Sequence, residues 1–95
     1  MKANKKKLKI TEKLDFSSIS VKGSDATNFL QSQLTNNIKE LGKNSLSHQL
    51  NGYCSPKGRL IAVIRVLFLR ENEFILLIPK ELSNLFLKRF KMFVL

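Results

Sequence analysis

An almost unbroken apolar run from Leu60 to Leu69 is the strongest structural pattern in the chain, and Arg65 is the only charge inside it. Alternation would place Leu60, Ala62, Ile64, Val66 and Phe68 on one face, and Ile61, Val63, Leu67 and Leu69 on the other. A strand that is apolar on both faces is typical of the middle of a covered sheet. A polar turn at 70–73 and a second apolar run at 74–78 then predict the returning strand of a hairpin.

Two further strands are predicted from weaker patterns. Residues 14–22 alternate partially between apolar and polar side chains, which indicates an early strand. Residues 45–54 have the pattern of a strand interrupted by the turn-forming pair Asn51-Gly52. Pro56-Lys57-Gly58 predicts a tight turn just before the long apolar strand.

Apolar residues at helical spacing predict a helix after Gly23. Ser24 can cap its first turn, and Asp25 suits the positive end of the helix dipole. Gly42 fits a stop near the end of this segment. The apolar stripe consists of Ala26, Phe29, Leu30, Leu34 and Ile38. Pro79 suits the first position of a final helix, whose apolar face would hold Leu82, Leu85, Phe86, Phe90, Phe93 and Val94.

The order of predicted elements is strand, helix, strand, strand, strand, helix. It predicts an α+β fold in which two helices cover a mixed or antiparallel sheet. The 95 residues suffice for one domain, or for part of a larger one. We expect residues 1–12 to form a flexible basic tail and residues 13–95 to form one incomplete domain.

Charge is concentrated at the N-terminus. Residues 1–13 hold six lysines and one glutamate, a balance of +5 that makes up half of the net charge of +10. Such a tail is typical of a solvated segment, and its alternative role is weak, non-specific binding of nucleic acid. Arginine, the better residue for bidentate phosphate contacts, is scarce, with 4 arginines against 13 lysines.

The sequence also indicates a cellular compartment. Its apolar runs are much shorter than the roughly 18 residues that a membrane span requires. The basic N-terminus is not followed by the apolar segment of a signal peptide. A single cysteine, Cys54, cannot form an internal disulfide. We therefore expect a soluble cytoplasmic protein that does not bind membranes.

Few residues point to chemistry on their own. His48 and Cys54 do not have the spacing of a metal site, and a lone cysteine is usually an inert, buried side chain. Gln33 and Asn37 interrupt the apolar stripe of the first helix. Buried amides need partners, so these two either bond to nearby backbone or meet a ligand.

The turn before the long strand is the other polar feature. Lys57 and Arg59 lie on either side of Gly58, and two cations beside a glycine can hold an anion. A charged, solvated turn is an equally good interpretation from the sequence.

Three segments, taken together and in order, are typical of one protein family. Residues 23–38 read GSDATNFLQSQLTNNI, close to the family segment G-x-D-A-x-x-F-L-Q-x-Q-L-T-N-D-I. Residues 53–60 read YCSPKGRL, close to Y-C-x-P-K-G-R-M/L, and residues 87–94 read LKRFKMFV, close to L-x-K-F/Y-x-x-F/V-x. From about Leu14 onward the chain therefore resembles the N-terminal part of YgfZ-type folate-binding proteins, which are relatives of the glycine cleavage T protein.

The resemblance implies a ligand and a site. It implies a partial first domain of a T-protein-like fold, which binds tetrahydrofolate together with a missing C-terminal part. Seven residues before Gly23, where the family has an aromatic residue that stacks on the pterin, this chain has Phe16. Asn37 stands where the family usually has Asp. The candidate folate-binding residues are Phe16, Gln33, Asn37, Lys57 and Arg59.

The resemblance also implies a role. YgfZ-type members support the maintenance of iron–sulfur enzymes, including one that modifies tRNA, so such enzymes become expected partners. The family's later motif K-x-C-Y-x-G-Q-E, which carries its functional cysteine, does not occur in the chain. The T protein has acidic residues where Ile61 and Ala62 stand here, and neither of these side chains can exchange a proton. The resemblance thus favours a non-enzymatic folate-binding protein over an aminomethyltransferase-like fragment.

The alternative from another class is a small basic RNA- or ribosome-associated module. Most of the 7 phenylalanines fall on predicted core faces, whereas a base-stacking platform needs exposed rings. We further expect the chain alone to bind folate weakly and to self-associate, because an open strand edge invites pairing with another copy.

Overall fold

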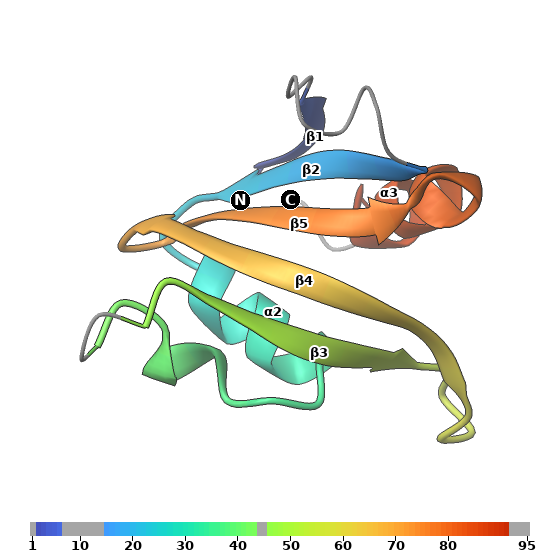
Figure 1. Cartoon of the computed structure of the whole chain (residues 1–95), viewed down its shortest axis with the longest axis horizontal. Helices are drawn as coiled ribbons and strands as arrows, with labels where there is room; N and C mark the ends of the chain where they lie inside the picture. Colours follow the sequence, from blue (N-terminus) through green and yellow to red (C-terminus); the bar gives the residue numbers. More distant parts are fainter. Residues whose placement is uncertain (1, 7–14, 44–45, 92–95) are drawn as a thin grey trace.

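An antiparallel sheet of five strands forms the body of the part of the chain that the structure describes (Figure 1). The structure, a computed structural model, describes residues 2–6, 15–43 and 46–91. The strands are β1 (Lys2–Lys6), β2 (Phe16–Lys22), β3 (His48–Cys54), β4 (Leu60–Arg70) and β5 (Glu73–Pro79). The helices are α2 (Ala26–Gln33) and α3 (Ser83–Lys91), with short 3-10 helices η1 (Ile38–Glu40) and η2 (Lys80–Leu82).

The strand order is β1-β2-β5-β4-β3, and every neighbouring pair is antiparallel. The long apolar strand β4 lies between β5 and β3, and it forms the predicted hairpin with β5. β2 joins that hairpin by pairing with β5 from Phe16 opposite Pro79 to Lys22 opposite Glu73. The predicted α+β class, with two helices on an antiparallel sheet, is confirmed.

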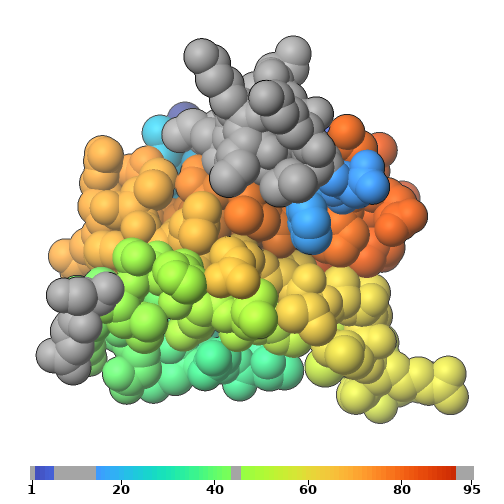
Figure 2. Space-filling view, viewed as in Figure 1, coloured from blue at the N-terminus to red at the C-terminus, as the bar shows by residue number. Residues whose placement is uncertain are grey.

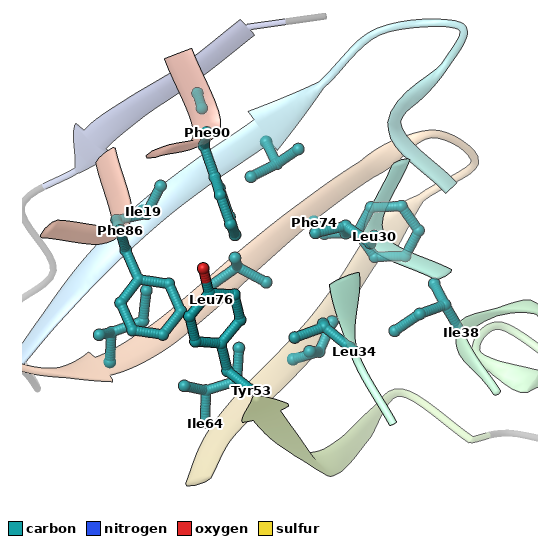
Figure 3. Packing of buried hydrophobic residues seen from close by; sticks show 14 of the residues in the cluster. Ile19, Leu30, Leu34, Ile38, Tyr53, Ile64, Phe74, Leu76, Phe86 and Phe90 are labelled. Carbon is teal, nitrogen blue, oxygen red and sulfur yellow. The ribbon is translucent and has the colours of Figure 1, made fainter. Parts of the chain in front are cut away.

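Both helices pack on one face of the sheet, where the hydrophobic core lies (Figure 3). Phe86 and Phe90 are four residues apart on α3, so they project from the same side of the helix, and both are fully buried. Their ring centroids are 5.7 Å apart, and Phe29 of α2 meets Phe90 edge to face at 5.1 Å. Leu85 was expected in this core but is 43% exposed, because it lies off the side of α3 that carries the two rings.

The opposite face of the sheet, called here the second face, carries the alternate positions of the strands. On β4, Ile64 and Val66 are buried in the core, whereas Val63 on the second face is 52% exposed. The expectation that both faces of this strand are covered is therefore wrong in the described part of the chain. The reason is that both described helices lie on the core side of the sheet.

Residues 2–6 differ from the flexible tail that the sequence suggested. They form strand β1, and Ala3, opposite Val21, is only 3% exposed. A strand forms here with one small apolar residue among lysines, because β2 offers an unpaired backbone edge to which residues 2–6 can bond. That edge exists only in the folded structure. The remainder of the expected tail, residues 7–12, and the end of the final helix, residues 92–95, lie outside the described residues.

The first helix ends earlier than its apolar stripe predicted. Leu34 takes up an extended conformation and forms a bridge with Tyr53, which stops α2 at Gln33. Leu34 and Ile38 are still buried, at 7% and 1% exposure, but from a bend and from η1. The N-cap is Asp25 rather than Ser24, and its side chain makes no capping hydrogen bond.

Candidate functional site

The segment just after α2 lies against the outer edge of β3. Thr35 N donates to Gly52 O at 3.1 Å, and Thr35 Oγ1 accepts from Gly52 N at 2.9 Å. Asn36 N donates to Oδ1 of Asn51 at 2.7 Å. These bonds occupy backbone groups that another chain would need in order to pair with β3. The edge of β3 is thus covered at Gly52 by the chain itself.

Asn51 and Gly52 are part of strand β3 and do not form the predicted turn. The Asn51 side chain is 2% exposed, and its Nδ2 donates to Gln49 Oε1 at 2.8 Å. A side chain at Gly52 would place its Cβ 3.2 Å from Thr35 Oγ1, closer than most Cβ contacts. Asn51 and Gly52 therefore make close contact with the segment after α2. Their local turn propensity does not reveal this role.

The two amides predicted on the helix face have different surroundings. Gln33 is the last residue of α2, half-buried, and its Nε2 donates to Ser32 Oγ at 3.3 Å. Asn37 is exposed, and its Oδ1 accepts from Lys39 N at 3.1 Å, which caps η1. Asn37 thus bonds to nearby backbone from an exposed position, and its contact with a ligand stays a prediction.

The cationic turn lies between β3 and β4 and is confirmed as a turn. Gly58 N donates to Ser55 O at 2.9 Å, and Ser55 N donates to Arg59 O at 2.8 Å. Gly58 has a φ of +81°, which glycine adopts without strain. Lys57 and Arg59 are both exposed, so their charges are available to a ligand.

Phe16 lies at the same end of the sheet as this turn (Figure 1). It begins β2, faces away from the core and is 40% exposed. β2 is separated from β4 by the single strand β5, and the register places Arg59 about four residues of strand beyond the level of Phe16. At normal strand dimensions the ring and the turn are therefore ~16 Å apart. A flat aromatic ring and two cations thus border one end of the second face.

Gln33 and Asn37 do not lie at the end of the second face that Phe16 and the cationic turn border. Gln33 belongs to α2 and therefore lies on the helix side of the sheet. Asn37 O accepts from Gln49 Nε2 at 3.2 Å. Gln49 lies five residues before Cys54, the end of β3 next to the cationic turn, and five residues correspond to ~16 Å of strand. The five candidate residues do not form one contiguous surface in the described part of the chain.

Soft and titrating groups are sparse in the described residues. Cys54 is a half-buried free thiol at the end of β3. His48 Nδ1 lies 2.9 Å from Nη1 of Arg65 on the second face. Among residues 2–6, 15–43 and 46–91, no three His, Cys, Asp or Glu side chains come close enough to hold a metal ion. No helix in this part of the chain is long and apolar enough to cross a membrane.

Tyr53 is the most unusual polar group in the core. It is 1% exposed, and its hydroxyl has no hydrogen-bond partner in the described part of the chain. Figure 3 shows this hydroxyl among apolar side chains near Phe86 and Phe90. Burial raises the pKa of Tyr53, because a phenolate is poorly solvated there, and the positive charge of Arg89 acts in the opposite direction. The Arg89 guanidinium lies 5.4 Å from the ring centroid.

We expect Tyr53→Phe to stabilise the chain by ~1–3 kcal/mol at neutral pH, since it removes a buried hydroxyl without a partner. Because the pKa of Tyr53 in the folded chain is raised above its ordinary value of 10.0, the wild-type chain should also lose stability as pH rises through that raised value. The variant should not show this loss. Urea unfolding at pH 7 and pH 11 measures both effects.

The chain contains one tyrosine and no tryptophan, so phenolate absorbance reports on Tyr53 alone. The titration midpoint should be higher in the folded chain than in urea. Equal midpoints would show that the hydroxyl is accessible to solvent, and a destabilised Tyr53→Phe variant would show that it has a hydrogen-bond partner.

No family model matches the chain, and no solved structure matches it significantly. A curated protein of Buchnera aphidicola, the tRNA-modifying protein YgfZ, is 33% identical over 79 residues, or 83% of this chain. The chain is similar to a YgfZ protein. An uncharacterized protein of Haemophilus influenzae is 34% identical over 64 residues, or 67% of this chain.

The chain spans a small part of these relatives. The matches cover 24% of the Buchnera protein and 22% of the Haemophilus protein. The similarity to YgfZ agrees with the resemblance seen in the motifs. Because the matches cover so little of these relatives, the activity, ligands and partners of a whole YgfZ protein can be proposed, but not stated, for this chain.

Proposed function

We propose that this chain is the N-terminal part of a YgfZ-type folate-binding protein. The similarity to the Buchnera tRNA-modifying protein YgfZ over 83% of the chain carries the proposal. The arrangement at one end of the second face supports it, because Phe16 is exposed there and the cationic turn lies at the same end of the sheet. A pterin is a flat ring that stacks well on an aromatic face, and the glutamate part of folate carries carboxylates that cations attract.

The proposed role is binding rather than transfer of a one-carbon group. Ile61 packs against the core, and Ala62 is 8% exposed in β4. Neither side chain offers a proton acceptor to a substrate, which supports a non-enzymatic function. We propose that a whole protein containing this chain serves iron–sulfur enzymes and, through them, tRNA modification.

The RNA-binding alternative receives less support. Phe74, Phe86 and Phe90 are buried in the core, so they cannot stack on bases. The Phe16 side chain is 40% exposed, but one exposed ring is a poor stacking platform for single-stranded nucleic acid.

The proposal is tested in a chimera in which this chain replaces the matching segment of the Buchnera relative. Tetrahydrofolate binding is measured by titration calorimetry. Phe16→Ala should weaken binding by about 5- to 150-fold, the effect expected for losing one stacking partner of ~1–3 kcal/mol. Leu69→Ala, which truncates an exposed side chain on β4, is the control and should change little. Unchanged affinity in Phe16→Ala would remove Phe16 from the site.

A second variant of the same chimera tests the cationic turn. Replacing both Lys57 and Arg59 with Gln should weaken folate binding and flatten its dependence on salt, because exposed charges act through a screened field. The double variant of Lys39 and Lys43, two exposed lysines after α2, removes the same charge elsewhere. If both double variants bind folate alike, the turn is only a charged loop.

A further inference from the structure

Large apolar side chains are exposed together on the second face, over β3 and β4. Leu50 is 53% exposed, Leu60 is 62% exposed and Val63 is 52% exposed. We call these three residues the β3–β4 apolar surface. Figure 2 shows the molecule from this side, with β3 in green and β4 in yellow at the surface. Contiguous exposed apolar side chains on a soluble domain are typical of an interaction site.

The strand register explains why the three residues are neighbours. Gly52 pairs with Val63, and two residues further along, Leu50 pairs with Arg65. A register shift between Tyr53 and Cys54 then turns Ile61 towards the core and aligns Leu60 with Cys54. A Cβ at Gly52 would lie 3.1 Å from Leu60 Cδ1, so Leu60 leans across the glycine. The surface is thus continuous across both strands.

A positive charge lies within this surface. Arg65 is half-buried opposite Leu50, and its Nη1 lies 2.9 Å from His48 Nδ1. Arginine has no acceptor atom, so Nδ1 of His48 must accept this hydrogen bond. No carboxylate within the described residues forms an ion pair with Arg65; the pair present there joins Arg70 to Glu73 at 3.4 Å. A protein that covers this surface would therefore bury the Arg65 guanidinium, which then needs an anionic partner.

We propose that the β3–β4 apolar surface is the docking site for the remaining three quarters of a YgfZ-type protein, which would place a carboxylate opposite Arg65. This inference rests on the proposed function. The relatives are about four times as long as the matching part, so most of their surface is available to cover this face. A second copy of this chain fits less well. It would bring a second Arg65 to the same place, and each chain carries a net charge of +10.

The test uses the part of the Buchnera relative outside the match, produced as a separate polypeptide whose folding is first verified by circular dichroism. This chain is titrated into it by calorimetry in the absence of folate. The unmodified chain should bind. Val63→Lys should weaken binding at least about tenfold, as expected for a charge placed in the centre of an interface. Leu85→Lys adds the same charge at an exposed apolar position on α3, the other side of the sheet, and should bind like the unmodified chain.

A second substitution tests the carboxylate. Arg65→Met keeps an apolar stem of similar length but removes the charge, and it should also weaken binding about tenfold. Thermal unfolding of each variant identifies those that no longer fold. If Val63→Lys unfolds, Leu60→Lys, at a more exposed position of the same surface, replaces it.

Three results would overturn the proposal. The first is absence of binding by the unmodified chain, and the second is an equal loss for Val63→Lys and Leu85→Lys. The third is sedimentation showing that the chain forms a dimer that Val63→Lys dissociates. Docking without any folate binding in the chimera would contradict the proposed function alone, whereas folate binding by the chimera without docking on this surface would contradict only this inference.

Discussion

Replacing Phe86 with alanine is expected to lower the free energy of unfolding by ~3–5 kcal/mol, the usual cost of deleting a buried phenylalanine. Phe86 is fully buried, and its ring centroid lies 4.4 Å from that of Tyr53 and 5.7 Å from that of Phe90. It joins α3 to the sheet. A helix of 9 residues is marginal without such packing, so the loss should extend to the whole helix.

The measurement is urea unfolding followed by far-ultraviolet circular dichroism. A domain of this size typically has ~5–15 kcal/mol of stability in total, so the variant should be close to unfolding at 37 °C. Leu85→Ala is the matched control, since Leu85 precedes Phe86 on the same helix and is 43% exposed. It should cost well under half as much. Equal losses in the two variants would mean that α3 does not pack on the sheet through Phe86.

Gly42→Ala should have the second-largest effect, a loss of ~2–5 kcal/mol. Gly42 has a φ of +86°, which costs a residue with a side chain ~1–2 kcal/mol. Its Cβ would also lie 2.7 Å from Cζ of Phe68, and forcing a ring to move within a packed region costs a further ~1–3 kcal/mol. Phe68 is half-buried and packs against the core, so moving its ring disturbs those contacts.

Gly58→Ala separates the two causes. Gly58 has nearly the same backbone angle, a φ of +81°, but a Cβ there would meet nothing within 4 Å. The Gly58→Ala variant should therefore lose only the ~1–2 kcal/mol of stability that the positive φ costs. Thermal unfolding of both variants gives the difference. If Gly42→Ala is no worse than Gly58→Ala, the contact with Phe68 does not restrict this position.

Much of the candidate site depends on contacts between distant segments. Sequence motifs identified Phe16 and the turn of Lys57 and Arg59, and the structure places both at one end of the second face. Asn51 was missed as a buried amide because Asn-Gly is a common turn pair. Its partner Asn36 lies 15 residues away, and no local pattern marks such a contact. Tyr53 was known only as a motif residue, since its burial depends on α3.

The sequence by itself determined the α+β class, the hairpin of β4 and β5, the turn at Gly58 and the buried stripe of the first helix. These features follow from alternation, helical spacing and turn residues, which act within a few positions of the chain. Only the tertiary structure decided that residues 2–6 form a strand, that α2 stops at Gln33 and that one face of β4 stays exposed. Each of these depends on what a backbone edge or an apolar face meets in space. An apolar residue favours burial wherever it lies, but which layer covers it is set by the arrangement of distant elements.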